Sequence, residues 1–307
     1  MKASVIVMDY KRKKYILDAL QSIKNQKGID LNDIEVIVVK YYQDEKIDNY
    51  IKENFPNHKI INLDPNDPDH YIGRTISEGI KEASSNLIFL LEDDDMFTEN
   101  KISRIFEVVE KIKNYDEYLI WNKAILTDEA GKPLKTLRHK HLSNNNSIIL
   151  YIKDKDKLID YIRGIYYSVD LFFLCYFDKN KKIIKLKEPL TYHRKSRESI
   201  TRGKRDRQML EMILKDIQYI YEKTKCKNQI PNIVTFKMLL NLLYNANYKI
   251  SLREYMEYLL MSLKFNEDYI KNLVRIVLYI FFKNYLRRYY LRKYTFIDLN
   301  IQNGKNS

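Results

Sequence analysis

Residues 87–97, LIFLLEDDDMF, join five consecutive apolar side chains to four consecutive acids. A short apolar run of this kind is typical of a strand that is buried on both faces of a sheet. In open α/β sheets, ligands bind at the carboxyl ends of the strands, which is where these acids follow. The stretch therefore predicts a buried strand that delivers carboxylates to a ligand-binding edge.

Strands and helices alternate around this stretch. We predict further strands at residues 3–8, 34–39 and 59–63, and helices at residues 13–26, 48–54, 74–84 and 99–112. Gly28 is expected to cap the first of these helices. The alternation predicts an α/β fold with a mostly parallel sheet that is flanked by helices. Beyond about residue 205 the pattern is helical throughout, so we expect an α/β domain over 1–204 and an α-helical region over 205–307.

The composition excludes several classes of protein. Apolar residues make up 45% and charged residues 31%, as in folded soluble proteins. Cys175 and Cys226 form neither a disulfide framework nor a metal-ligand pair by their spacing, which favours a cytoplasmic location. No run approaches the ~20 apolar residues of a membrane-spanning helix, so we do not expect an integral membrane protein.

Positive charge is concentrated in the last third of the chain. Residues 201–307 hold 20 Lys and Arg against 9 Asp and Glu, which is +11 of the total net charge of +13. This asymmetry predicts an anionic partner, such as a phospholipid headgroup, a lipid pyrophosphate or a nucleic acid. Residues 271–296 hold seven basic residues and no acid among many tyrosines and leucines. Peripheral contact with an anionic inner membrane face would explain this segment, and so would a buried helix that ends in a solvated basic stretch.

The four acids of residues 92–95 would repel one another at a buried edge. A divalent cation would remove this cost, because Mg²⁺ and Mn²⁺ prefer oxygen ligands and bridge carboxylates to phosphates. The alternative is a solvated acidic turn that precedes the helix at residues 99–112. The apolar strand that leads into the acids favours the metal site.

Three segments together resemble the family 2 glycosyltransferases, which have the GT-A fold: SVIVMDYKRKKYILDALQSIKNQ, IEVIVV and SEGIKEASSNLIFLLEDDDMF. Gly79, Ile80 and Ala83 match the helix that precedes the family's D-x-D strand, and Asp93 and Asp95 match the D-x-D motif. The resemblance covers residues 3–105 closely and 140–200 loosely. It implies a nucleotide-binding half at about 1–105 and an acceptor half at about 106–204. The implied reaction is a metal-dependent, inverting transfer from a nucleotide-diphosphate sugar to a hydroxyl of a glycan, lipid-linked or protein acceptor.

The resemblance also implies roles for individual residues. Asp95 would bind the Mn²⁺ or Mg²⁺ ion, and Asp93 would contact the ribose or the metal. After its second strand the family usually has two acids, one of which binds the base, whereas this chain has Lys40 and Tyr41. Two alternatives therefore stay open: the base is a purine, or the main chain makes the contact with the base. The residues that we expect to bind the nucleotide are Tyr10, Tyr41, Arg74, Asp93, Asp94 and Arg194.

On the acceptor side, Asp170 lies about twenty residues before LTYHR at 190–194, as the family's acceptor-side acid does. Its apolar neighbours would raise its pKa, which suits a general base that works near neutrality. A helix-capping or salt-bridged aspartate is the alternative. In some members of the family a histidine from this region is a further metal ligand, so His193 joins Asp93 and Asp95 as a candidate ligand. Most lone histidines are structural.

Two other functions remain open from the sequence. A nucleotidyltransferase usually has a glycine-rich basic loop after its first strand, and YKRKK at residues 10–14 has the charge but no glycine. A nucleic-acid-binding protein would explain the basic tail and leave the carboxylates unexplained. Nucleic acid is therefore not the partner that we expect.

Overall fold

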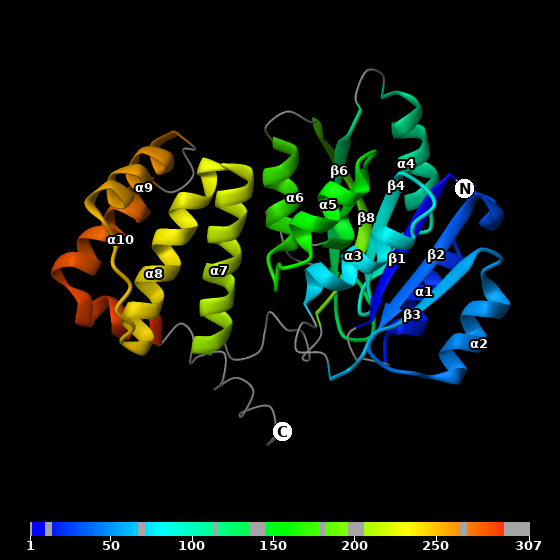
Figure 1. Cartoon of the computed structure of the whole chain (residues 1–307), viewed down its shortest axis with the longest axis horizontal. Coiled ribbons are helices and arrows are strands. Elements are labelled where there is room, and N and C mark those ends of the chain that lie inside the picture. The colour runs from blue at the N-terminus through cyan, green and yellow to red at the C-terminus, as the bar shows by residue number, and fades with distance from the viewer. Residues whose placement is uncertain are drawn as a thin grey trace. The chain divides into compact units, whose positions relative to one another are not determined.

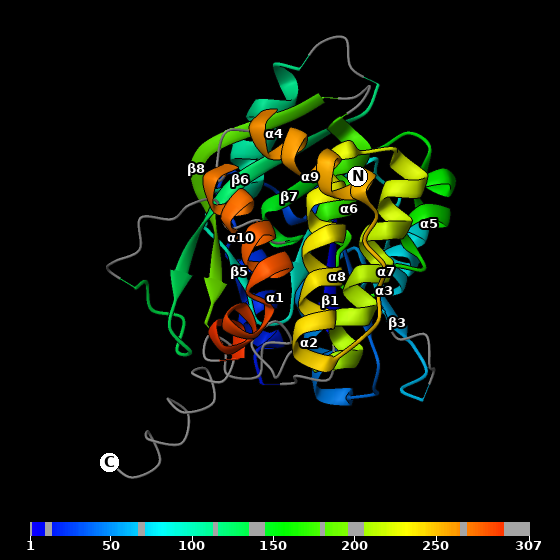
Figure 2. The same cartoon turned by 90° about the vertical axis from the view of Figure 1, so that its left-hand side faces the viewer.

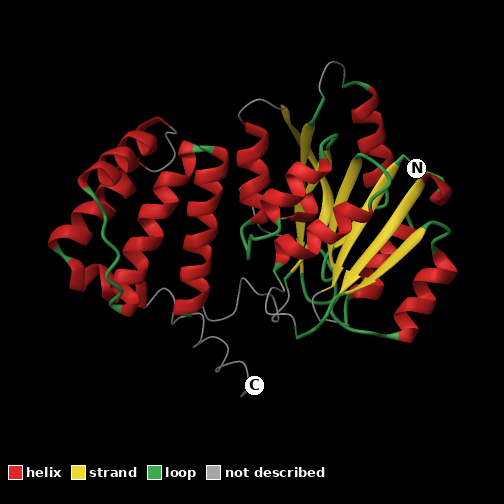
Figure 3. Ribbon diagram, viewed as in Figure 1, coloured by secondary structure: helices red, strands yellow, loops and turns green. Residues whose placement is uncertain are grey.

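The computed structural model describes residues 2–9, 14–66, 71–112, 116–134, 145–178, 182–195, 206–264 and 269–291. It divides into two compact units, Met1–Ser199 and Ile200–Ser307. The first unit is built on a sheet and the second on helices (Figure 3).

An eight-stranded sheet forms the centre of the first unit, with the strand order β3-β2-β1-β4-β7-β6-β8-β5 (Figure 1). Its strands are β1 (Ala3–Asp9), β2 (Ile34–Lys40), β3 (His58–Asn62), β4 (Leu87–Glu92), β5 (Met96–Phe97), β6 (Tyr118–Thr127), β7 (Ile148–Tyr151) and β8 (Lys182–Arg194). The first four run parallel, β7 is antiparallel to both of its neighbours, and β5 is antiparallel to β8. The prediction of a mostly parallel sheet is therefore confirmed.

Helices flank this sheet (Figure 3). They are α1 (Ile16–Lys24), α2 (Glu45–Asn54), α3 (Ile72–Glu82), α4 (Lys101–Glu110), α5 (Lys155–Ile162) and α6 (Val169–Asp178), with short 3₁₀ turns η1 (Leu31–Asp33) and η2 (Asn145–Ser147). Because helices cover the sheet, every residue of β1 and β2 is buried, and the apolar runs at 3–8, 34–39 and 87–91 are strands as predicted.

Two local predictions need correction. The first helix ends at Lys24 with Asn25 as its C-cap, so Gly28 is not the cap. Gly28 instead lies in the following turn with φ +74°, a left-handed conformation that glycine adopts without strain. The second helix begins at Glu45 rather than at residue 48, because the side chain of Asp44 accepts a hydrogen bond from the Ile47 N–H at 3.3 Å.

The second unit is helical, as the sequence predicts (Figure 2). It holds α7 (Arg207–Thr224), a 3₁₀ turn η4 (Lys227–Gln229), α8 (Ile230–Tyr244), α9 (Leu252–Lys264) and α10 (Tyr269–Phe281). Two apolar clusters join these helices: Val234, Met238, Tyr258 and Ile276 in one, and Leu239, Leu242, Leu286 and Tyr290 in the other. Within the described parts of the chain, no helix has the length and apolar character needed to cross a membrane.

Candidate active site

The four acids lie in a tight turn at the carboxyl end of β4. The Asp93 N–H donates to the Met8 carbonyl at 3.0 Å, and the Asp95 N–H donates to the Glu92 carbonyl at 3.2 Å. Glu92 is half-buried, whereas Asp93, Asp94 and Asp95 are each at most 5% exposed. The acids therefore do not form a solvated turn, and the alternative reading of this stretch is wrong.

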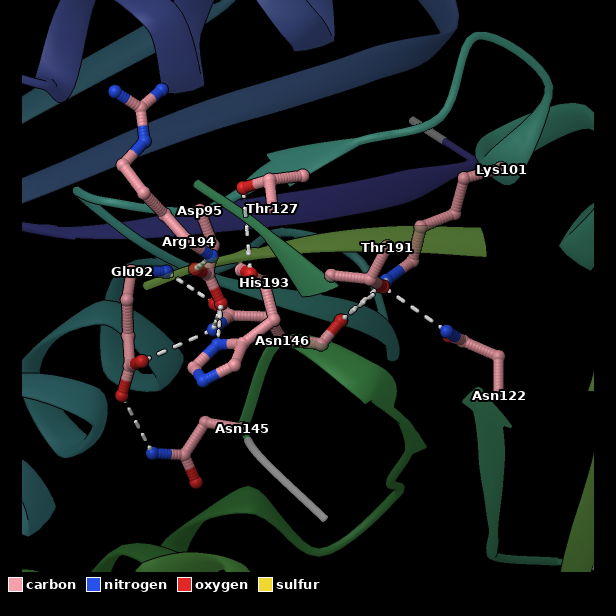
Figure 4. Close-up of polar contacts among 10 residues, drawn as sticks. All are labelled: Glu92, Asp95, Lys101, Asn122, Thr127, Asn145, Asn146, Thr191, His193 and Arg194. Atoms are coloured by element: carbon pink, nitrogen blue, oxygen red, sulfur yellow. Dashed lines mark hydrogen bonds and ion pairs between the residues drawn. The ribbon is translucent and has the colours of Figure 1, made fainter. Parts of the chain in front are cut away.

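The short antiparallel pair of β5 and β8 places Asp95 against the end of β8 (Figure 4). One carboxylate oxygen of Asp95 accepts from the Arg194 main-chain N–H at 2.8 Å. The other oxygen lies 3.0 Å from Nδ1 of His193. Asp95 and His193, two of the three predicted metal ligands, are thus neighbours in the fold.

Burial and charge shift the pKa values of this pair. Burial raises the pKa of Asp95, and the nearby charge of Asp94 adds to this rise, although His193 and the Arg194 N–H oppose it. Burial alone would lower the pKa of His193, but the hydrogen bond and charge of Asp95, with the charges of Glu92 and Asp94, outweigh it and raise the value to about 8. The cluster thus favours a positive charge on the imidazole, as expected where acids are crowded together.

An asparagine pair in η2 links the acids, and no sequence motif indicates this link. Nδ2 of Asn146 donates to Glu92 at 3.1 Å and to Asp95 at 2.5 Å, while its Oδ1 accepts from the Glu92 N–H. Asn145 donates from Nδ2 to the second Glu92 oxygen at 3.1 Å (Figure 4). Asn146 is fully buried, so it fixes Glu92 and Asp95 relative to each other.

A second layer of polar groups holds Asn146 in place. The Asn146 carbonyl accepts from Lys101 Nζ at 2.5 Å and from the Thr191 hydroxyl at 3.0 Å. Lys101 and Asn122 also donate to that hydroxyl, at 2.9 and 3.0 Å. Lys101 is fully buried, and burial lowers its pKa well below the usual range. This layer joins α4, β6, β8 and η2 behind the acids.

Two of the predicted nucleotide-binding residues, Tyr10 and Tyr41, come directly after β1 and β2 in the sequence. Tyr10 lies outside the described residues. Tyr41 is buried, and its hydroxyl lies 3.0 Å from Thr75 Oγ1 of α3. Lys40 is also buried, and its ammonium is 2.9 Å from an Asp48 oxygen. At the position where the family has an acid, the chain therefore has a lysine whose charge is balanced within the protein.

A buried carboxylate lies at this same edge of the sheet. Asp9 ends β1, stands opposite Lys40 in the strand register, and accepts a hydrogen bond from the Tyr42 hydroxyl. The carboxylate that is absent at Lys40 and Tyr41 is thus supplied by Asp9 of the neighbouring strand. Pairing of parallel strands creates this proximity, which no local motif indicates.

The remaining predicted residues come from three other elements. Arg74 is the third residue of α3 and is half-buried. Asp170 lies in the first turn of α6, where its carboxylate accepts from the Leu171 N–H at 2.8 Å. The Arg194 guanidinium is buried, donates to Asp18 at 2.6 Å and lies 4.5 Å from the centre of the Tyr15 ring. The main-chain N–H of Arg194 therefore contacts Asp95. Its side chain instead contacts Asp18 of α1 and Tyr15, the residue before α1.

The chemical types of the predicted ligands suit a hard divalent cation. Asp93 and Asp95 contribute carboxylates, which Mg²⁺ and Mn²⁺ prefer, and His193 contributes an imidazole. Across the described ranges, no three His, Cys, Asp or Glu side chains are gathered closely enough to form a metal site. Of the predicted ligands, Asp95 and His193 are in direct contact.

Comparisons with known proteins agree with this fold. The model of a family described as "Glycosyl transferase family 2" matches residues 4–165. The uncharacterized glycosyltransferase YwdF of Bacillus subtilis (strain 168) is 32% identical over 112 residues, which are 36% of this chain and 39% of YwdF. The chain thus aligns with well under half of that relative's length.

Solved structures of S. aureus TarS 1-349 have the same fold. One of them has a TM-score of 0.57 and 16% sequence identity. The match covers 99% of this chain and 92% of the TarS chain. The structure in complex with UDP-GlcNAc has a TM-score of 0.58 and 17% identity over the same shares. At this identity the likeness concerns the fold alone.

Proposed function

The chain belongs to glycosyl transferase family 2, because the matching model spans more than half of it, and we propose that it is a metal-dependent, inverting glycosyltransferase. The observation that carries this proposal is the buried group of Asp93, Asp94 and Asp95 at the carboxyl end of β4. Three buried carboxylates next to a histidine of raised pKa are costly unless a cation or ligand offsets them. Enzymes keep such costly arrangements at functional sites.

In the proposed reaction, Asp95, with Asp93 and His193, would hold Mn²⁺ or Mg²⁺. When bound, the cation would offset the charge that develops on the departing nucleoside diphosphate. Asn146 keeps Asp95 and Glu92 oriented for this role. Support for a metal comes from the burial of Asp93 and Asp95, whose negative charges a cation would offset. To bind that cation, His193 would have to release the proton that Asp95 favours.

Asp170 is proposed as the general base. Its carboxylate would take the proton from the acceptor hydroxyl as that oxygen forms a bond to the anomeric carbon. The bond from this carbon to the diphosphate oxygen breaks, and its electron pair leaves with the nucleoside diphosphate. A single displacement of this kind inverts the configuration of the sugar.

The proposed donor is a nucleotide-diphosphate sugar, and the proposed acceptor is a glycan or a lipid-linked hydroxyl. The UDP-GlcNAc complex of TarS supports the donor class. Tyr10, Tyr41, Arg74, Asp93 and Asp94 are proposed to line the nucleotide site. In this proposal Arg194 acts through its main-chain N–H on Asp95, because its guanidinium is engaged elsewhere.

A donor screen tests the proposal. We expect one of UDP-, GDP-, ADP- or CMP-sugars to raise the melting temperature in the presence of Mn²⁺ and not in EDTA, because a ligand that binds only the folded state stabilises it. The same donor should release its nucleoside phosphate leaving group in a metal-dependent assay. Stabilisation by nucleoside triphosphates with release of pyrophosphate would instead indicate a nucleotidyltransferase.

Replacing Asn146 with alanine tests the positioning of the acids. Loss of the bonds to Glu92 and Asp95 should reduce metal-dependent activity by about 10- to 100-fold, as for other residues that orient metal ligands. Titration of Mn²⁺ against activity should attribute this loss to weaker metal binding. Asn145→Ala is the matched control, because Asn145 donates to Glu92 and not to Asp95; a similar loss in both variants would contradict a specific role for Asn146.

A further inference from the structure

The described part of the second unit ends with residues 281–291, a segment that is attached through two side chains and otherwise largely exposed. Residues 283–291 are helical, and Leu286 and Tyr290, one turn apart, are buried against Leu239 and Leu242 of α8. Aromatic rings of the same segment are largely exposed: Phe281 is 73% exposed, Phe282 58%, Tyr285 65% and Tyr289 53%. The segment is therefore held by two side chains, while four of its rings lie at the surface.

Basic side chains lie among these rings. Lys283 and Arg288 are exposed, and Arg287 is half-buried. From residue 269 to residue 296 the sequence contains seven Lys and Arg and no acid. Exposed rings would favour an apolar partner, and the basic side chains among them would favour an anionic one.

An anionic bilayer surface has both properties. Tyrosine and phenylalanine rings insert at the level of the headgroups, and lysine and arginine are attracted to acidic lipids at the same depth. A second copy of the chain fits less well, because it would bring like charges together over the same rings. A nucleic acid would match the charge but would leave the four exposed rings between residues 281 and 289 without an apolar environment.

We propose that residues 281–291 bind the surface of a membrane that contains anionic phospholipids. The segment would lie in the plane of the interface, with Phe281, Phe282, Tyr285 and Tyr289 in the headgroup region and Lys283 and Arg288 at the lipid phosphates. The inference concerns the second unit and is independent of the transfer reaction, so either can fail alone.

Co-sedimentation of the full chain with vesicles tests the inference. Vesicles of phosphatidylglycerol and phosphatidylcholine should sediment the protein at low salt, and pure phosphatidylcholine vesicles should not. Rising salt should weaken the binding, because exposed charges are screened. Equal binding to both kinds of vesicle, or no binding to either, would overturn the proposal.

Charge-reversal variants locate the surface. Lys283→Glu with Arg288→Glu should weaken binding by at least about 25-fold, which is about fivefold for each basic residue removed. The matched control is Lys215→Glu with Lys227→Glu, which makes the same change of charge at exposed lysines of α7 and η4. Equal loss in both pairs would mean that net charge alone drives binding and would contradict a defined surface.

Removal of the rings separates membrane binding from other anion binding. Phe281→Ser with Phe282→Ser should weaken vesicle binding by about tenfold or more and leave the melting temperature nearly unchanged, since both rings are exposed. Unchanged vesicle binding in this variant would overturn the proposal. So would tighter binding of duplex DNA than of anionic vesicles, or a dimer in sedimentation equilibrium that dissociates on Phe281→Ser.

Discussion

Asp95→Asn is expected to reduce sugar transfer by about 10³-fold, because a bound metal ion contributes several kcal/mol to stabilising the leaving group. The substituted amide keeps an oxygen that can accept from the Arg194 N–H, which is 2.8 Å away in the wild-type protein, whereas its NH2 group would face the Asn146 amide, which donates to Asp95 at 2.5 Å. We expect the fold to persist without this hydrogen bond, which circular dichroism and the melting temperature will check. Asp33→Asn is the matched control, since it makes the same chemical change at an exposed ion pair with Lys2.

The same variant has a readout that does not depend on activity. Asp95 is the main group that raises the pKa of His193 to about 8, against burial, which lowers it. Without this carboxylate the imidazole should titrate below 8, toward or below its ordinary value of 6.5, in NMR spectra of metal-free protein. An unchanged transfer rate would remove the main support for the metal site, and an unchanged His193 pKa would contradict the geometry on which it rests.

The parallel half of the sheet was predictable because its signal is local. Residues 3–8, 34–39 and 87–91 are apolar except for Ser4 and Glu35, and a strand that is buried on both faces needs a largely apolar run. The four acids were identified for the same reason, since they follow the last of these runs directly. The family resemblance pointed to the same residues.

The supports of the site were not predictable, because they depend on contacts between distant parts of the chain. Asn146 meets Asp95 across 51 positions, and Lys101 meets Thr191 across 90. No spacing rule links such pairs. Asparagines 145 and 146 also follow a region without clear hydrophobic periodicity, where a pair of amides is typical of a turn. Only the pairing of β7 with β4 brings that turn beside the acids.

Arg194 illustrates a second limit. A basic residue after a strand suggests phosphate binding, yet its guanidinium is held by Asp18, 176 positions away, and by the face of the Tyr15 ring. Sequence patterns indicate that a charge is present without indicating the direction in which it points. The backbone N–H of the same residue, which any amino acid except proline could supply, is the group that contacts Asp95.

Gly73→Ala is expected to destabilise the first unit by about 3 kcal/mol, near the upper end for overpacking, because the clash is with main chain rather than with a movable side chain. A Cβ at this position would lie 1.9 Å from the Ile162 carbonyl oxygen and 2.7 Å from that of Ile165. These carbonyls approach closely because the loop after α5 caps α3: the Gly73 N–H donates to the Ile165 oxygen at 3.0 Å. A helix start needs such acceptors for its free N–H groups, so the loop cannot withdraw without losing them.

Gly164→Ala is the matched control, because it lies in the same loop and an added Cβ would meet nothing within 4 Å. Urea melts should place this variant within about 1 kcal/mol of the wild type, since the alanine also restricts the unfolded chain. The loop leads into α6, which carries Asp170, so Gly73→Ala should also reduce activity at temperatures where the variant is still folded. Equal midpoints for the two variants would show that the loop can move away from α3. In that case the position of Asp170 would not be set by the contact between this loop and the start of α3.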